Sequence, residues 1–101
     1  MNDRPHLNIY ATIRPSLVAR RPQLMSLSRE GLVVRAHRLL GPGQRARVTI
    51  HFIDSGRDVE SDVEVASVNH DLGDMALRFV TLTEGGREAI ALYIGARAAR
   101  K

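Results

Sequence analysis

Apolar and polar residues alternate along several short segments of this chain, which is the pattern of β-strands that bury one face. The first segment runs from Leu7 to Ile13, with apolar residues at the odd-numbered positions. Residues 45–53, 58–68 and 75–79 show the same alternation and predict three further strands. The side chains expected to point inward are Leu7, Ile9, Ala11, Ile13, Val48, Ile50, Phe52, Val63, Val65, Met75, Leu77 and Phe79.

Glycine, proline and small polar residues separate these segments and predict tight turns. Two shorter pieces, Leu24–Ser28 and Leu32–Ala36, flank Gly31 and predict strands on either side of a turn or bulge. The stretch between Pro15 and Pro22 predicts an edge or irregular segment, because proline has no backbone N–H to donate to a neighbouring strand. The other predicted turns are Gly41–Gly43, Asp54–Arg57 and Asn69–Asp74. Strands at this spacing predict a mainly β fold, a closed or nearly closed small antiparallel β-barrel.

The periodicity changes near the C-terminus, where a helix is predicted over about residues 84–99. Ile90, Tyr93 and Ile94 share one face of that helix. Thr83 is the expected N-cap. We expect the apolar face to pack on a barrel formed by residues 7–82, as a lid rather than as a partner-binding helix. With 101 residues in all, we expect one domain over residues 1–101.

Composition excludes several kinds of chemistry. The chain has no cysteine, which excludes a disulfide framework, a thiolate zinc site and a thiol nucleophile. The four histidines are far apart and form no i, i+4 metal pair, and no Gly-x-Ser-x-Gly motif is present. The acidic residues Glu60, Asp62 and Glu64 share one strand face, where a solvated surface is a simpler interpretation than a cation site. We therefore expect no enzyme, no metal and no cofactor.

The sequence also indicates where the protein acts. Its N-terminus has no apolar segment typical of a secretory signal. The longest apolar run, Ala89–Ile94, is too short to cross a bilayer, which takes about 20 residues. Together with the absence of cysteine, these features predict a cytoplasmic protein with no membrane span.

Charge is unevenly distributed along the chain. Residues 1–50 contain nine arginines and two acidic residues, whereas residues 51–101 contain nine acidic and six basic residues. A basic half attracts phosphate-bearing ligands, either a nucleotide or a nucleic acid, unless it is only a solvated surface. Arginine outnumbers lysine fourteen to one, and its planar guanidinium suits phosphates and guanine edges. Nucleic acid is the weaker alternative, because Tyr10 alone among the four aromatic residues lies in that half.

Ser26–Gly31 and Arg4–Asn8 carry the short motifs SxSxxG and RxxxN, which resemble two motifs of the PilZ family of bacterial cyclic di-GMP receptors. Ser26–Gly31 reads SxSxxG, where the family has DxSxxG or NxSxxG, so Ser26 replaces the acidic or amide residue. Arg4–Asn8 reads RxxxN where the family has RxxxR, so Asn8 replaces the second arginine. The turns, the hairpin and the closing helix also resemble the family's layout over nearly the whole chain.

The resemblance implies a split-barrel fold, a regulatory role and a ligand site. The implied cyclic di-GMP contacts are Arg4, Asn8, Ser26, Ser28 and Gly31, and nearby arginines able to compensate for the substitutions are Arg20, Arg21 and Arg29. In such a site arginines pair with guanine or phosphate, and an acidic residue accepts hydrogen bonds from the N–H groups of guanine. Glycine allows the ligand to approach the backbone closely. Ser28 and its neighbours also fit ordinary turn hydrogen bonding.

We therefore expect a non-enzymatic PilZ-like regulatory module linked to cyclic di-GMP signalling in motility, pili or exopolysaccharide control. The substitutions at Asn8 and Ser26 favour weak or lost dinucleotide binding and action through protein partners. The alternatives are a functional receptor that uses Arg4, Ser28, Gly31 and nearby arginines, and a small nucleic-acid-binding barrel.

Overall fold

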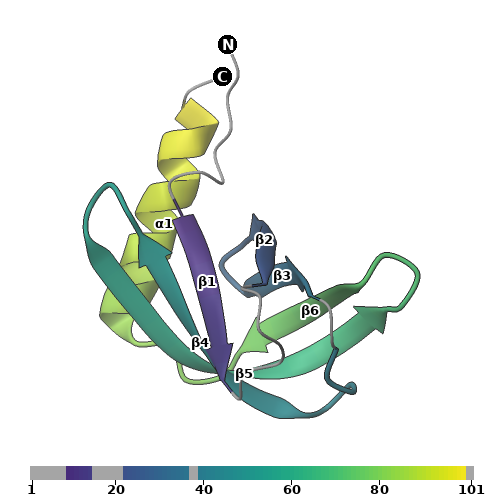
Figure 1. The fold of residues 1–101 in the computed structure, drawn as a ribbon. Helices are drawn as coiled ribbons and strands as arrows, with labels where there is room; N and C mark the ends of the chain where they lie inside the picture. The colour runs from purple at the N-terminus through teal and green to yellow at the C-terminus, as the bar shows by residue number, and fades with distance from the viewer. Residues whose placement is uncertain (1–8, 15–21, 37–38, 100–101) are drawn as a thin grey trace.

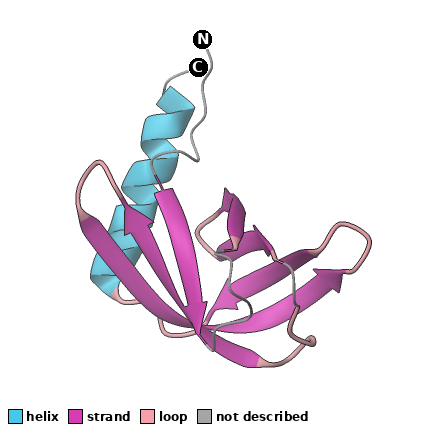
Figure 2. Cartoon of the chain, in the orientation of Figure 1, coloured by secondary structure: helices cyan, strands magenta, loops and turns pink. Residues whose placement is uncertain are grey.

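The computed structural model describes residues 9–14, 22–36 and 39–99, and within them six strands and one helix. Figures 1 and 2 show the strands forming a strongly curved sheet, with the helix against one side of it. The predicted strand at Leu7 is seen from Ile9 onward, and the stretch between Pro15 and Pro22 lies outside the described residues. The elements are β1 (Ile9–Arg14), β2 (Gln23–Leu27), β3 (Gly31–Arg35), β4 (Arg45–Phe52), β5 (Arg57–Asn69), β6 (Asp74–Phe79) and α1 (Glu84–Ala99).

The strands are antiparallel and follow the order β1-β4-β5-β6-β3-β2 in a nearly closed barrel. The long β4–β5 hairpin sets the register, with Ile50 opposite Val59 and Ala46 opposite Val63. A bulge shifts the β2–β3 register between Leu24 and Ser26. The predicted fold class, a small antiparallel barrel with a C-terminal helix, is confirmed.

One face of each strand supplies the core, as the alternation predicts. Every described residue expected to point inward is buried, except Phe79, which is half-buried. Val48, Ile50, Val63 and Met75 are completely inaccessible to solvent. The exposed face alternates with this core, so a one-residue slip in register would exchange the two faces.

The predicted turns form where glycine allows them. Gly43 and Gly56 adopt φ values of 88° and 72°, which lie in the left-handed region that favours glycine. The first closes the predicted 41–43 turn, and the second lies in the hairpin loop between β4 and β5. Gly73, with a φ of 75°, belongs to the predicted turn between β5 and β6.

Helix α1 begins as predicted. The Thr83 hydroxyl oxygen accepts the amide N–H of Gly86 at 3.0 Å, which is an N-cap hydrogen bond. Ile90 is fully buried, and the Tyr93 ring packs against Phe52 of β4 with 5.6 Å between ring centroids. This apolar face attaches the helix to the barrel, as predicted. No helix in the described residues is long and apolar enough to cross a membrane.

Candidate functional site

The SxSxxG segment forms the turn between β2 and β3. The Ser28 hydroxyl accepts the amide N–H groups of Glu30 and Gly31, each at 3.3 Å, and donates to the Gly31 carbonyl at 3.3 Å. The Ser28 amide also donates to the Gly31 carbonyl, at 2.8 Å. A hydroxyl has one donor and two acceptor positions, so these contacts use its whole hydrogen-bonding capacity. Ser28 therefore acts in the turn itself, as the ordinary turn-bonding interpretation predicts.

Gly31 is required by the close approach of β3 to β6. A β-carbon added at Gly31 would lie 1.9 Å from the Leu77 carbonyl oxygen, far inside van der Waals contact. The neighbouring Glu30 carbonyl accepts the Phe79 amide N–H at 2.9 Å, which fixes the turn to β6. In the family motif, the glycine is expected to let a ligand approach the backbone closely. Here the group close to Gly31 is the backbone of β6.

The remaining predicted site residues are distributed differently. Ser26 is exposed next to the β2 bulge, and among the described residues its hydroxyl makes no side-chain hydrogen bond. Arg29 is exposed at the tip of the turn. Arg4, Asn8, Arg20 and Arg21 lie outside the described residues. The structure therefore brings together Ser28, Arg29 and Gly31, and the proximity of the other candidates stays a prediction.

A small groove lies between this turn and helix α1. It has a volume of about 250 Å³ and is lined by Leu82, Ile90 and Ala91, with Arg29 and Arg87 beside them. Sequence reasoning missed Leu82, Arg87 and Ala91. Arg87 and Ala91 are four residues apart and so share a helix face, but only the fold shows that this face meets Arg29.

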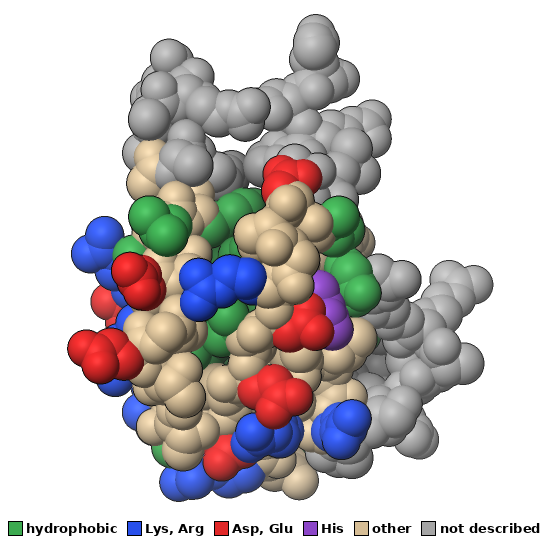
Figure 3. Space-filling model, turned by 90° about the vertical axis from the view of Figure 1, so that its left-hand side faces the viewer, with side chains coloured by type: hydrophobic (Ala, Val, Ile, Leu, Met, Phe, Trp, Pro, Cys, Tyr) green, Lys and Arg blue, Asp and Glu red, His purple; other side chains and the backbone are tan. Residues whose placement is uncertain are grey.

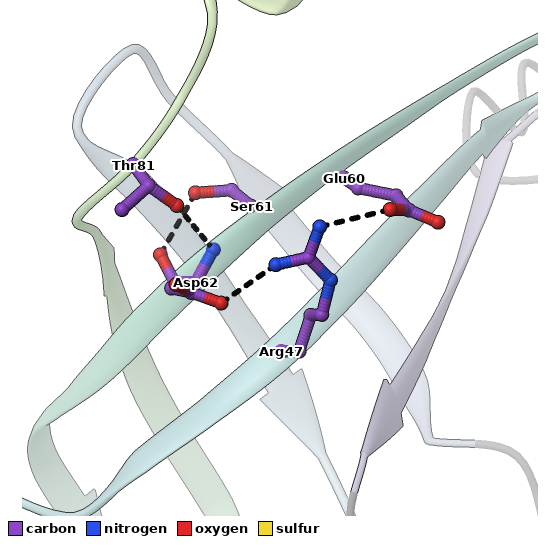
Figure 4. Close-up of polar contacts among 5 residues, drawn as sticks. All are labelled: Arg47, Glu60, Ser61, Asp62 and Thr81. Atoms are coloured by element: carbon purple, nitrogen blue, oxygen red, sulfur yellow. Dashed lines mark hydrogen bonds and ion pairs between the residues drawn. The ribbon is translucent and has the colours of Figure 1, made fainter.

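A charged network covers the outer face of β4 and β5 (Figure 4). The Arg47 guanidinium donates to Glu60 Oε1 at 2.9 Å and to Asp62 Oδ1 at 2.8 Å. These hydrogen bonds, the one to Glu60 foremost, raise the pKa of Arg47 above its ordinary value. The Asp62 amide donates to Thr81 Oγ1 at 2.8 Å, which ties the network to the segment leading into α1.

Arg47 therefore occupies the acidic face on which the sequence suggested a solvated surface or a cation site. The Glu60 and Asp62 carboxylates both bind its guanidinium. No group of three or more metal-ligating side chains occurs in the part of the chain that the structure describes.

Two more arginines of the sheet form similar ion pairs. Arg35 binds Asp74 through two hydrogen bonds of 2.7 and 3.2 Å, and hydrogen bonding to Asp74 raises the pKa of Arg35 above its ordinary value. Arg78 pairs with Glu64 across β6 and β5. Figure 3 shows acidic and basic side chains interspersed on the face it displays. On that face, the charge asymmetry of the sequence does not produce one basic surface.

A second cluster lies at the other end of the β4–β5 hairpin. The His51 ring stacks on Tyr10 with centroids 4.3 Å apart and an interplanar angle of 18°. His51 Nδ1 lies 3.0 Å from Asp58 Oδ1. Near this cluster a hollow of about 440 Å³ lies between the hairpin and the start of α1, and its lining residues include Arg47, Arg57, Asp58 and Glu60. Arg47 and Glu60 already bind each other, and Asp58 lies against His51.

Comparison with solved structures finds a clear likeness in fold. The Bacillus subtilis inhibitor of motility MotI/DgrA, a PilZ-domain protein, matches with a TM-score of 0.76 and 19% sequence identity. The match covers 92% of this chain and 48% of that protein, so this chain spans about half of its length. No protein-family model and no curated protein matches the sequence. The structural likeness shows that this chain has a PilZ-like fold.

Proposed function

We propose that this chain is a non-enzymatic, cytoplasmic PilZ-like regulatory module that acts in bacterial motility control through contacts with protein partners. The observation that carries the proposal is the SxSxxG turn in a barrel of PilZ-like fold. Its serine, Ser28, makes hydrogen bonds within the turn, and its glycine, Gly31, packs closely against the backbone of β6. The likeness to MotI/DgrA, an inhibitor of motility, supports the choice of process.

Weak or lost cyclic di-GMP binding is part of this proposal. Ser26 has no carboxylate to accept a charge-assisted hydrogen bond from guanine, and Asn8 removes one guanidinium from the RxxxR motif. A hydrogen bond to a charged group contributes about 1.5–3 kcal/mol. Each substitution therefore lowers affinity by roughly tenfold to somewhat more than a hundredfold. Losing both contacts is enough to carry a micromolar ligand out of its useful range.

The pairing of charges on the outer face of the sheet also favours action through protein partners over binding of a dinucleotide. Arg35, Arg47 and Arg78 each bind carboxylates of this same chain. An arginine held in this way is less available to a phosphate, since the phosphate has to displace a carboxylate. Contacts with a partner are then expected where the charged side chains are not paired within the chain.

A motility assay in the source bacterium tests the regulatory role. Deleting the gene should change the swimming diameter in soft agar, and expressing the wild-type chain should restore it. The effect should persist when a phosphodiesterase lowers cellular cyclic di-GMP, because the proposed module does not depend on the dinucleotide. Swimming that is identical with and without the gene, at both low and high dinucleotide levels, would overturn the proposal.

A further inference from the structure

The groove between the β2–β3 turn and α1 combines an apolar floor with two unpaired arginines. Leu82, Ile90 and Ala91 form the floor, and Arg29 and Arg87 line its sides. Arg29 and Arg87 are both exposed, and none of the five ion pairs among the described residues includes either of them. This distinguishes them from Arg35, Arg47 and Arg78, which bind carboxylates.

Acidic side chains occur nearby without neutralising these two arginines. Glu30 follows Arg29 in the turn, and Glu84 and Glu88 lie on α1 with Arg87. All three are exposed and, like the two arginines, take part in no ion pair among the described residues. The guanidiniums are therefore available to carboxylates from another molecule.

The size of the groove selects the kind of ligand. Its volume of about 250 Å³ is below the roughly 300–1,000 Å³ of small-molecule sites, so it suits one apolar side chain rather than a dinucleotide. Protein interfaces commonly place such an anchoring side chain in a pocket with a polar rim, and arginine is enriched among the residues that dominate their binding energy.

We propose that this groove docks a partner protein through a segment that presents one apolar side chain flanked by carboxylates. The apolar side chain enters between Leu82 and Ala91, and the flanking carboxylates pair with Arg29 and Arg87. The inference rests on the proposed function, namely that the module acts through protein contacts. It adds the place and the chemistry of the contact, which spans the motif turn and the C-terminal helix together.

Short peptides serve as probes of this chemistry. Amide chemical shifts of the ¹⁵N-labelled chain would be followed while acetyl-Glu-Leu-Glu-amide is added, with acetyl-Lys-Leu-Lys-amide and acetyl-Glu-Ala-Glu-amide as matched controls. We expect weak saturable binding of the first peptide, with shifts centred on residues 28–31, 82 and 86–91. The lysine peptide should bind less well because of charge, and the alanine peptide because it leaves the floor unfilled.

Two sets of variants separate the charged rim from the apolar floor. Exchanging both arginines, Arg29→Glu with Arg87→Glu, should lower affinity for the glutamate peptide by roughly tenfold and reverse the preference in favour of the lysine peptide. Ala91→Leu should fill the groove and abolish binding of both the glutamate and the lysine peptide. Leucine has a high helix propensity, so α1 should be retained. Arg45→Glu is the control, because Arg45 is an exposed arginine outside the groove and outside the five ion pairs.

Equal shifts with all three peptides, shifts centred away from the groove, or no binding up to the solubility limit would overturn the docking site. So would an unchanged preference in the double arginine variant. These outcomes leave the regulatory role intact if deletion of the gene still changes swimming, so failure of the site and failure of the proposed function are distinguishable.

Discussion

Replacing Gly31 with alanine tests whether this motif glycine is required by the fold itself. The added β-carbon would lie 1.9 Å from the Leu77 carbonyl oxygen and 2.9 Å from its carbonyl carbon. Both atoms belong to the backbone of β6, so no side-chain rotation relieves the contact. β3 and β6 have to move apart, which weakens the pairing of Gly31 with Arg78 and of Leu32 with Leu77.

The size of the effect follows from the cost of overpacking. Forcing an extra carbon into a well-packed region costs about 1–3 kcal/mol. For a domain of this size, each 1 kcal/mol shifts the melting temperature by about 4–8 °C. Gly31→Ala should therefore lower the melting temperature by roughly 4–24 °C, measured by far-ultraviolet circular dichroism and checked by urea denaturation.

Gly95→Ala is the matched control for this experiment. Gly95 lies in α1, and a β-carbon added there meets nothing within 4 Å. Because glycine in a helix is about 0.5–1 kcal/mol less favourable than alanine, this variant should be stabilised. A Gly31→Ala protein as stable as the wild type would refute the argument that β6 dictates this glycine.

Three further substitutions test the fold more broadly. Ile50→Ala removes a completely buried side chain and should lower the free energy of unfolding by about 2–5 kcal/mol, and an unchanged urea midpoint would contradict its core position. Thr83→Ala removes the N-cap hydrogen bond and should cost about 1 kcal/mol, whereas Thr83→Ser should retain most of the stability. Arg47→Ala should lower the melting temperature slightly at low salt and not at high salt, because exposed ion pairs are screened. Since the pKa of Arg47 is raised, its contribution is present below the ordinary arginine pKa while both carboxylates are ionised, and it is lost as the pH rises through the raised value. The Arg47→Ala difference should therefore be the same at neutral and mildly alkaline pH, and a difference that fades there would argue against the assigned contacts.

Most of the fold could be predicted from the alternation of apolar and polar residues. In β4 and β5 the period of two assigns Val48, Ile50 and Val63 to the core, because a strand side chain has only two faces to choose from. The helix was also predictable, since Thr83 supplies a cap and Ile90 recurs with Tyr93 and Ile94 on one face.

The environment of the candidate site was harder to predict. The requirement for Gly31 depends on Leu77, and the pairing of Arg47 depends on a register that places it opposite Asp62. Such contacts join residues that are far apart in sequence. Local patterns carry no information about strand order, so neither the charge pairing nor the meeting of Arg29 with Arg87 was evident from the sequence.

Calorimetric titration with cyclic di-GMP tests whether this PilZ-like domain has weak or lost dinucleotide binding. We expect no submicromolar binding by the wild-type chain and a gain of binding when Asn8→Arg is combined with Ser26→Asp. A submicromolar dissociation constant for the wild-type chain that is lost in Arg4→Ala would contradict this expectation and identify the chain as a functional receptor.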